Sequence, residues 1–268
     1  MKTTTTRPIA RRSAGTPIVG WDHVNRDDLA SLGQARVARS NGKPVFVLRD
    51  PKGESPMLRF DPDQTIVGDR AFLILGEQAG YLRVLLPIRP NGTVGWVKAT
   101  EVRSEPSALR VVVELSTNTL SLYRDERVIL RDQVATGTGN NPTPKGLFFI
   151  VDRLPQANAA AGLGPIVLKL SGFSETLASF AGGQGAIGLH GTNAPGLIGG
   201  RVSHGCVRMA NATITKLASL LPIGTPVQVV DRLTDITRPT SVRRLTLEPT
   251  VTDSSVPASP TPETTLGA

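Results

Sequence analysis

HGTNAPGLIGGRVSHGCVRM, residues 190–209, brings together the single cysteine of the chain and two of its three histidines, in glycine-rich turns between short apolar segments. Cys206 follows His204 and Gly205 directly, and His190 begins the stretch. A thiol with an ordinary pKa of about 8.5 is barely ionised at neutral pH, and a nearby imidazole can accept its proton. Glycine lets the backbone turn sharply, so adjacent N–H groups can point at a developing oxyanion. The stretch therefore predicts acyl transfer through a thioester.

The spacing within this stretch suggests a role for each residue. Cys206 is the expected nucleophile and His204 the expected base, because residues two apart in an extended backbone lie on the same side. Ser203 is a candidate third member that orients His204, and the N–H groups of Gly205 and Cys206 are candidate oxyanion donors. Two alternatives stay open. The cysteine could be a small buried hydrophobic residue, or it could bind zinc together with His190 and His204.

Four residues are candidates for substrate binding: His190, Gly191, Thr192 and Arg208. The guanidinium of Arg208 could bind a substrate carboxylate through its planar fork, or it could brace the loop. Thr192 could serve only to build the turn. His204 and Cys206 lack the helical i, i+4 spacing of paired metal ligands, so we do not expect a metal ion.

The rest of the chain predicts a mostly β protein with two units. Short apolar runs broken by turn residues, such as PVFVLRD, AFLILGE and GYLRVLLPI, predict a small barrel over residues 34–104. A second β-rich pattern covers residues 109–232 and includes the alternating TLSLYR and a short helix after the cysteine, with Asn211 as its N-cap. We expect each unit to bury a core of its own. The segments expected outside the units are a flexible leader at 1–33, a linker at 105–108 and a disordered tail at 238–268.

Charge and hydropathy narrow the class of partner. The net charge of +8 and the pI near 10.2 fit an anionic partner. Nucleic acid is not expected, because the sequence contains no helix-turn-helix spacing and no aromatic RNA-binding signature. It also contains no apolar run long enough for a membrane span or for the core of a signal peptide.

The same residues resemble the catalytic domain of the L,D-transpeptidase family. Its signature is His-Gly-Thr followed by Ser/Thr-His-Gly-Cys-Ile/Val-Arg, which HGT at 190–192 and SHGCVR at 203–208 match. The resemblance runs from about Leu109 to Asp231 and includes the Thr-Pro-x-Gly turn at 143–146. Residues 34–104 more loosely resemble bacterial SH3-like domains, ending in GTVGWV at 92–97, as a spacer or a wall-binding module.

The resemblance implies a β-sandwich-like fold and a role in peptidoglycan cross-linking, cell wall biogenesis and cell shape. Cys206 would attack the third residue of a stem peptide, with His204 as base and His190 lining the cleft, and D-alanine would leave. A second stem amine would then take the acyl group and form a 3→3 link. The resemblance also implies acylation by carbapenems, no metal or organic cofactor, and an extracytoplasmic location. Because the sequence shows no export signal, we expect that the precursor starts further upstream; another export route and an internal substrate are the alternatives. Hydrolysis of wall peptides, non-catalytic wall binding and a redox-sensing thiol are alternatives.

Overall fold

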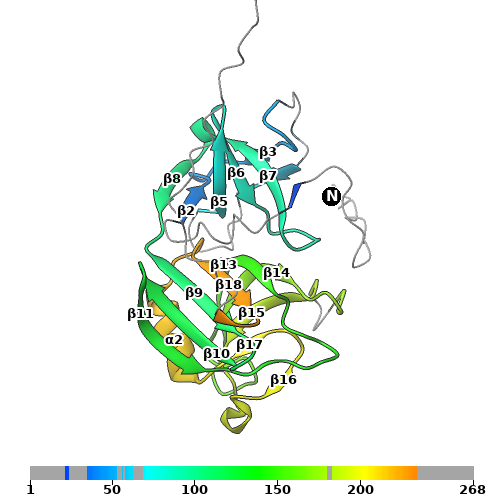
Figure 1. Ribbon diagram of the computed structural model, residues 1–268, viewed down its shortest axis with the longest axis vertical. Coiled ribbons are helices and arrows are strands. Elements are labelled where there is room, and N and C mark those ends of the chain that lie inside the picture. Colours follow the sequence, from blue (N-terminus) through cyan, green and yellow to red (C-terminus); the bar gives the residue numbers. More distant parts are fainter. Residues whose placement is uncertain are drawn as a thin grey trace, which may run out of the picture.

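A computed structural model describes residues 22–23, 35–52, 56, 58–62, 69–179 and 183–233 (Figure 1). The described chain is mostly β, as expected, and contains one α-helix. The tail expected at 238–268 and most of the leader expected at 1–33 lie outside the described residues. Within that leader, however, Asp22 and His23 form a short strand that pairs with Thr93 and Val94.

The N-terminal unit, which comprises residues 35–106 and the first short strand, is a six-stranded sheet with a separate hairpin. Its strands are β1 (Asp22–His23), β2 (Arg36–Arg39), β3 (Val45–Val47), β4 (Leu58–Phe60), β5 (Ala71–Gln78), β6 (Tyr81–Leu85), β7 (Thr93–Lys98) and β8 (Arg103–Pro106), with the 3-10 helix η2 (Ala99–Glu101). The sheet order is β1-β7-β6-β5-β2-β8, and β3 pairs with β4. Alternate side chains of β5 and β6, including Phe72, Leu82 and Val84, are buried in its core.

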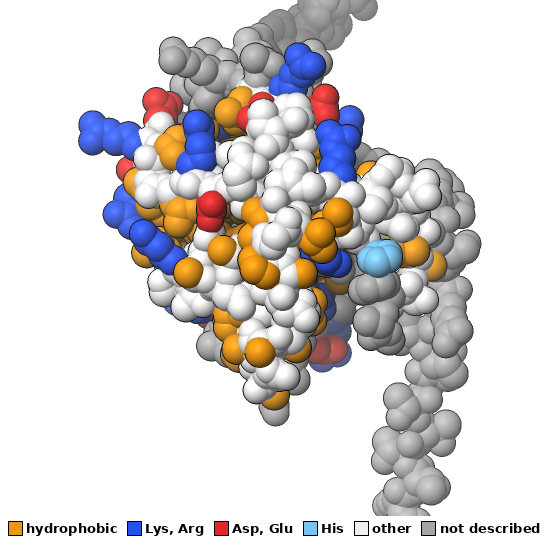
Figure 2. Space-filling view, turned by 90° about the horizontal axis from the view of Figure 1, so that it is seen from below, with side chains coloured by type: hydrophobic (Ala, Val, Ile, Leu, Met, Phe, Trp, Pro, Cys, Tyr) orange, Lys and Arg blue, Asp and Glu red, His pale blue; other side chains and the backbone are white. Residues whose placement is uncertain are grey.

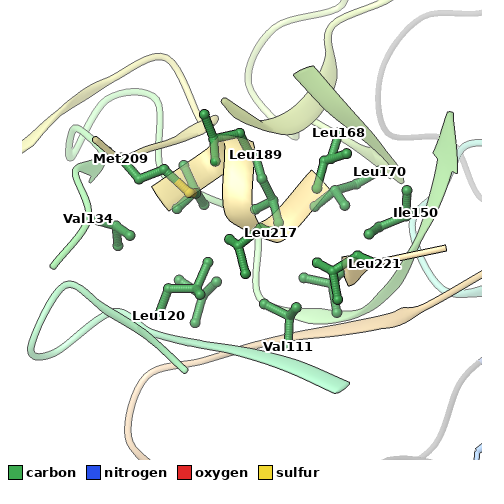
Figure 3. Close-up of a cluster of buried hydrophobic side chains, with 14 of the residues drawn as sticks. Val111, Leu120, Val134, Ile150, Leu168, Leu170, Leu189, Met209, Leu217 and Leu221 are labelled. Atoms are coloured by element: carbon green, nitrogen blue, oxygen red, sulfur yellow. The ribbon is translucent and has the colours of Figure 1, made fainter. Parts of the chain in front are cut away.

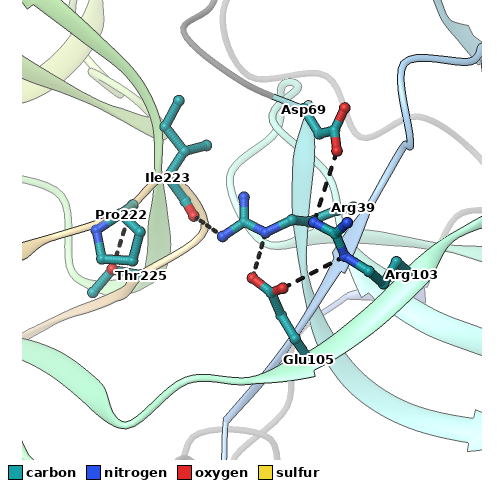
Figure 4. Close-up of polar contacts among 7 residues, drawn as sticks. All are labelled: Arg39, Asp69, Arg103, Glu105, Pro222, Ile223 and Thr225. Atoms are coloured by element: carbon teal, nitrogen blue, oxygen red, sulfur yellow. Dashed lines mark hydrogen bonds and ion pairs between the residues drawn. The ribbon is translucent and has the colours of Figure 1, made fainter.

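The segment expected as a linker is largely part of this unit. Glu105 and Pro106 end strand β8, where they pair with Val37 and Arg36 of β2. Glu105 also forms an ion pair with Arg39, whose other guanidinium nitrogen donates to the carbonyl of Ile223 at 2.9 Å (Figure 4). The expectation of a linker at 105–108 is therefore wrong for its first half, because backbone pairing continues through Pro106.

The C-terminal unit, residues 109–233, is built around an eight-stranded sheet. Its elements are β9 (Leu109–Glu114), β10 (Thr119–Arg124), β11 (Arg127–Gln133), β12 (Thr136–Gly137), β13 (Gly146–Pro155), β14 (Ile166–Phe173), β15 (Ala186–His190), η3 (Pro195–Leu197), β16 (Arg201–Ser203), β17 (Val207–Arg208), α2 (Asn211–Leu220) and β18 (Pro226–Val230). The sheet order is β11-β10-β9-β18-β13-β14-β15-β17, and β12 pairs separately with β16. Two neighbouring pairs, β9 with β18 and β15 with β17, are parallel.

Helix α2 covers one face of this sheet. Ile214, Leu217 and Ala218 are buried from the helix, and Leu221 follows them just beyond its end. These side chains pack against sheet residues that include Val111, Leu120, Ile150, Leu168 and Leu189 (Figure 3). The short helix expected after the cysteine is confirmed. No helix among the described residues is long and apolar enough to span a membrane.

The opposite face of the sheet packs against the N-terminal unit. Side chains alternate along β13, so Leu147 and Phe149 point away from the helix. They form one buried cluster with Ala35, Leu73, Leu85 and Val94 of the N-terminal unit, and Phe149 is fully buried. Figure 1 shows the two units stacked, with β13 and β18 near the junction. Each unit thus has a core of its own, as expected, and the two units also share this smaller buried cluster at their junction.

Candidate active site

Parallel pairing of β15 with β17 brings His190 beside the cysteine loop. His190 is in register with Arg208, and Leu189 with Val207. Cys206 immediately precedes β17, and its thiol forms a hydrogen bond with the backbone of Gly188 in β15. Arg208 lies two residues after Cys206, and side chains two apart along a strand lie on the same side. His190, which is in register with Arg208, therefore shares that side with Cys206. The sheet thus assembles residues that lie 16 apart in the sequence.

The imidazole of His190 is held in one tautomer. Its Nδ1 lies 2.6 Å from the carbonyl oxygen of Gly191, and because a carbonyl only accepts, Nδ1 carries the hydrogen. The side chain is 3% exposed. The pKa of His190 is lowered from 6.5 to about 4, mainly by burial and also by the charge of Arg208, while the bond to Gly191 opposes both effects. At neutral pH the ring is therefore uncharged, and Nε2 is its proton acceptor.

The thiol of Cys206 is likewise neutral in the resting protein. Burial raises its pKa above the ordinary value, while the hydrogen bond with the Gly188 backbone and the charge of Arg208 oppose this rise. The side chain nevertheless keeps partial exposure to solvent. In the resting protein the thiol proton has therefore not passed to the imidazole of His190. This neutral pair suits proton transfer at the moment of attack rather than a stored thiolate.

Ser203 has a different partner from the one expected. Its hydroxyl donates to the carbonyl oxygen of Cys206 at 2.6 Å and accepts from the N–H of Gly205 at 3.1 Å. Gly205 has a φ of 114°, a conformation that other residues rarely adopt. Ser203 is 1% exposed and closes this turn, so its hydroxyl hydrogen is committed to Cys206 rather than to His204. The same bonds commit the Gly205 N–H, which was an expected oxyanion donor.

His204 points outward from this turn. Its side chain is exposed, whereas the residues on either side, Ser203 and Gly205, are buried. Figure 2 shows a face of the molecule whose centre carries mainly hydrophobic and uncharged side chains, with Lys and Arg side chains toward its edge. The ring of His190, by contrast, is buried, and its backbone partner fixes its orientation. The structure therefore favours His190 over His204 as the partner of the thiol.

Gly191 and Thr192 form a turn that is fixed by Asn211. The side-chain oxygen of Asn211 accepts from the N–H of Thr192 at 2.9 Å, and the hydroxyl of Thr192 accepts from the N–H of Ala194 at 3.0 Å. A Cβ added at Gly191 would lie only 2.1 Å from that Asn211 oxygen. Asn211 was expected as the helix N-cap, but Ala210 occupies the cap position. The turn-building interpretation of Thr192 has this direct support.

Arg208 presents an unpartnered nitrogen. Its Nε is buried and has no hydrogen-bond partner among the described residues. Its backbone exchanges hydrogen bonds with Ala135 in both directions, at 2.7 and 2.8 Å. A buried guanidinium N–H without a partner is costly unless a ligand engages it. This arrangement fits the carboxylate-binding interpretation of Arg208.

Metal binding finds no support in the arrangement of ligating side chains. Over the described ranges, no three His, Cys, Asp or Glu side chains are grouped so that they could hold a metal ion. Two residues that contribute to the site were missed in the sequence, namely Gly188 and, in its actual role, Asn211. Gly188 lies in AIGLH, where a glycine inside an apolar strand signals close backbone approach.

Comparison with known proteins identifies the family that this chain is similar to. The profile of the YkuD L,D-transpeptidase catalytic domain matches residues 108–229. YkuD of Bacillus licheniformis is 38% identical over 120 residues, which cover 45% of this chain and 64% of YkuD. YqjB of Bacillus subtilis is 33% identical over 129 residues, covering 45% of this chain and 70% of YqjB. The names of both proteins assign them to the L,D-transpeptidases.

The chain spans a little under two thirds of the length of YkuD. A solved structure, the catalytic domain of an E. faecium L,D-transpeptidase, aligns with 46% of this chain and 96% of its own, at 23% identity and a TM-score of 0.36. The match to YqjB, together with the profile match over 108–229, establishes the family. This chain belongs to the L,D-transpeptidase catalytic domain family.

Proposed function

We propose that this protein is a cysteine-dependent L,D-transpeptidase that acts on peptidoglycan stem peptides. The observation that carries the proposal is the buried His190, whose Nδ1 is bonded to Gly191 at 2.6 Å and whose pKa is lowered to about 4. Such a ring is neutral over the physiological pH range and presents Nε2 as a base. It lies beside the loop that carries the only thiol of the chain.

In the first half-reaction, Nε2 of His190 takes the thiol proton as Sγ of Cys206 attacks the carbonyl carbon of the third stem residue. The C–S bond forms, the C–N bond to the terminal D-alanine breaks, and the imidazolium returns its proton to the leaving amine. In the second half-reaction, an amine of another stem attacks the thioester carbonyl. The C–S bond breaks, an amide forms, and the amine proton passes through His190 to restore the thiol.

Three other groups support these steps. The N–H of Cys206 is the proposed oxyanion donor, because Ser203 already engages the N–H of Gly205. The buried Nε of Arg208 is proposed to bind a stem carboxylate as a charge-assisted hydrogen-bond donor. Ser203 serves the site indirectly, since its bond to the Cys206 carbonyl fixes the loop. The substrate places this activity outside the cytoplasmic membrane.

Hydrolysis of the thioester is the second candidate, because the partly exposed Cys206 is open to water as an acceptor. Mass analysis of products from a purified stem tetrapeptide separates the two reactions. A cross-linked dimer with released D-alanine indicates transfer, and free tripeptide alone indicates hydrolysis. Cys206→Ala is the matched control and should give neither product. The proposal fails if the parent protein forms no dimer, or if Cys206→Ala forms it equally well.

A further inference from the structure

The β6–β7 connection of the N-terminal unit holds the backbone that leads into β15. The Arg89 guanidinium donates to the carbonyl oxygen of Ser174 at 2.7 Å through Nη1, and to those of Leu177 and Gln184 at 3.0 Å each through Nη2. Its carbon also lies 4.9 Å from the ring centroid of Phe173. One side chain thus gathers carbonyls from both ends of the β14–β15 connection, which is described at 174–179 and 183–185. Only arginine offers this many donors in a planar group.

Asn91, from the same connection, pairs with the end of β14 in the manner of a neighbouring strand. Its Nδ2 donates to the carbonyl of Phe173 at 2.8 Å, and its Oδ1 accepts from the N–H of Phe173 at 2.9 Å. Phe173 in turn is in register with Ala186, the first residue of β15. Together, Arg89 and Asn91 form five hydrogen bonds to the backbone at this end of the sheet.

This backbone leads directly to the reacting groups. Ser174 donates its N–H to Gly185 at 2.8 Å, and β15 begins at the next residue. Gly188, whose backbone bonds to the thiol of Cys206, and then His190 follow within this strand. The position of Gly188 relative to the thiol therefore depends on where β15 begins.

A second path leads from the same connection to the cysteine loop. The hydroxyl of Thr176 donates to the side-chain oxygen of Asn141 at 3.1 Å. The next residue, Pro142, has its carbonyl oxygen 3.5 Å from the position of a Cβ built on Gly205. A displacement of the β14–β15 connection could therefore shift the Cys206 turn in two ways, through Asn141 and Pro142 and through β15.

We propose that Arg89 and Asn91 are positioning residues for the Cys206 site, through which the N-terminal unit sets the placement of β15 against the thiol. The inference rests on the proposed role of Cys206 as nucleophile. It assigns the N-terminal unit a part in the chemistry that neither a spacer nor a wall-binding module would have. If Arg89 and Asn91 were purely structural, their loss would lower stability, but the reactivity of the Cys206 thiol in the folded protein would not change.

The test uses the full chain with Arg89→Ala, and Arg59→Ala as the matched control. Arg59 is an arginine of the same unit that pairs with Asp61 and has an exposed side chain. The first readout is the rate of Cys206 alkylation by iodoacetamide against pH, at a temperature where both variants are folded by circular dichroism. Loss of the Gly188 bond removes an interaction that lowers the pKa of the thiol, so the alkylation profile should move to higher pH in Arg89→Ala.

The second readout is turnover of a stem tetrapeptide. Misplacement of reacting groups by a fraction of an ångström should lower kcat about tenfold in Arg89→Ala with little change in KM. Arg89→Lys should recover part of that loss, because an ammonium keeps the charge but cannot reach three carbonyls in a plane. Arg59→Ala should match the parent protein in both readouts.

A folded Arg89→Ala with the parental alkylation profile overturns the inference, even if transpeptidation itself is confirmed. Because alkylation needs no stem peptide, this outcome is distinct from failure of the proposed function. If Arg89→Ala does not fold, Asn91→Ala receives the same measurements. It removes both bonds to Phe173, and a parental profile in that variant overturns the inference equally.

Discussion

His190 makes the stability of the protein depend on pH in a way that the structure specifies. Its pKa is about 4 in the folded protein and 6.5 as the ordinary value, mainly because burial disfavours the charged ring. Between these two values the unfolded chain binds more protons than the folded one, so lowering the pH favours unfolding. The two values differ by about 2.5, and each pKa unit corresponds to about 1.4 kcal/mol, so the full loss is about 3 kcal/mol.

Most of that loss should fall between pH 6.5 and pH 4. By pH 5 the free energy of unfolding should have dropped by about 2 kcal/mol on account of His190 alone. Urea unfolding at a series of pH values measures this, with His190→Gln as the reference because glutamine does not titrate. Subtracting the two curves leaves the contribution of His190 alone. Parallel curves for the parent protein and His190→Gln from pH 7 to pH 4 would refute the buried, neutral state of His190.

Three further predictions concern the thiol, the turn and the shared core. Cys206→Ser should lower turnover by roughly 10⁴-fold or more with the fold intact by circular dichroism, and a carbapenem should add once to the parent and not to the variant by intact mass. Gly191→Ala should destabilise the protein by about 1–3 kcal/mol in urea unfolding, since its Cβ would lie 2.1 Å from the Asn211 oxygen. Deleting the N-terminal unit exposes Leu147 and Phe149, which costs about 1.5–3 kcal/mol each, so the fragment should unfold at a lower temperature than the full chain in a thermal scan.

The strands were predictable wherever the pattern is local. TLSLYR at 119–124 alternates apolar and polar residues, and β10 has those same bounds. PVQVV at 226–230 coincides with β18, and AFLILGE begins where β5 begins. In each case the alternation of side chains and the flanking turn residues involve only a few neighbouring positions, so the sequence alone reveals the strand. Whether the N-terminal unit is SH3-like stays a prediction.

The site was predictable in its residues but not in their contacts. Adjacency in the sequence favoured His204 as the base, whereas the parallel pairing of β15 with β17 sets His190 in register with Arg208. Parallel pairing joins segments far apart in the chain, and no local pattern encodes it. The same holds for the cluster that Leu147 forms with the N-terminal unit, because an apolar strand does not reveal what covers each face.

The central claim is that Cys206 and His190 together perform the acyl transfer, with His204 outside the proton path. The most direct test is the rate at which a stem tetrapeptide acylates the protein, followed by intact mass after rapid quenching, in His190→Gln and His204→Gln. Loss of a general base should slow acylation of Cys206 about 10²–10⁴-fold in His190→Gln, while His204→Gln should stay near the parental rate. A slow His204→Gln beside a near-parental His190→Gln would contradict the account.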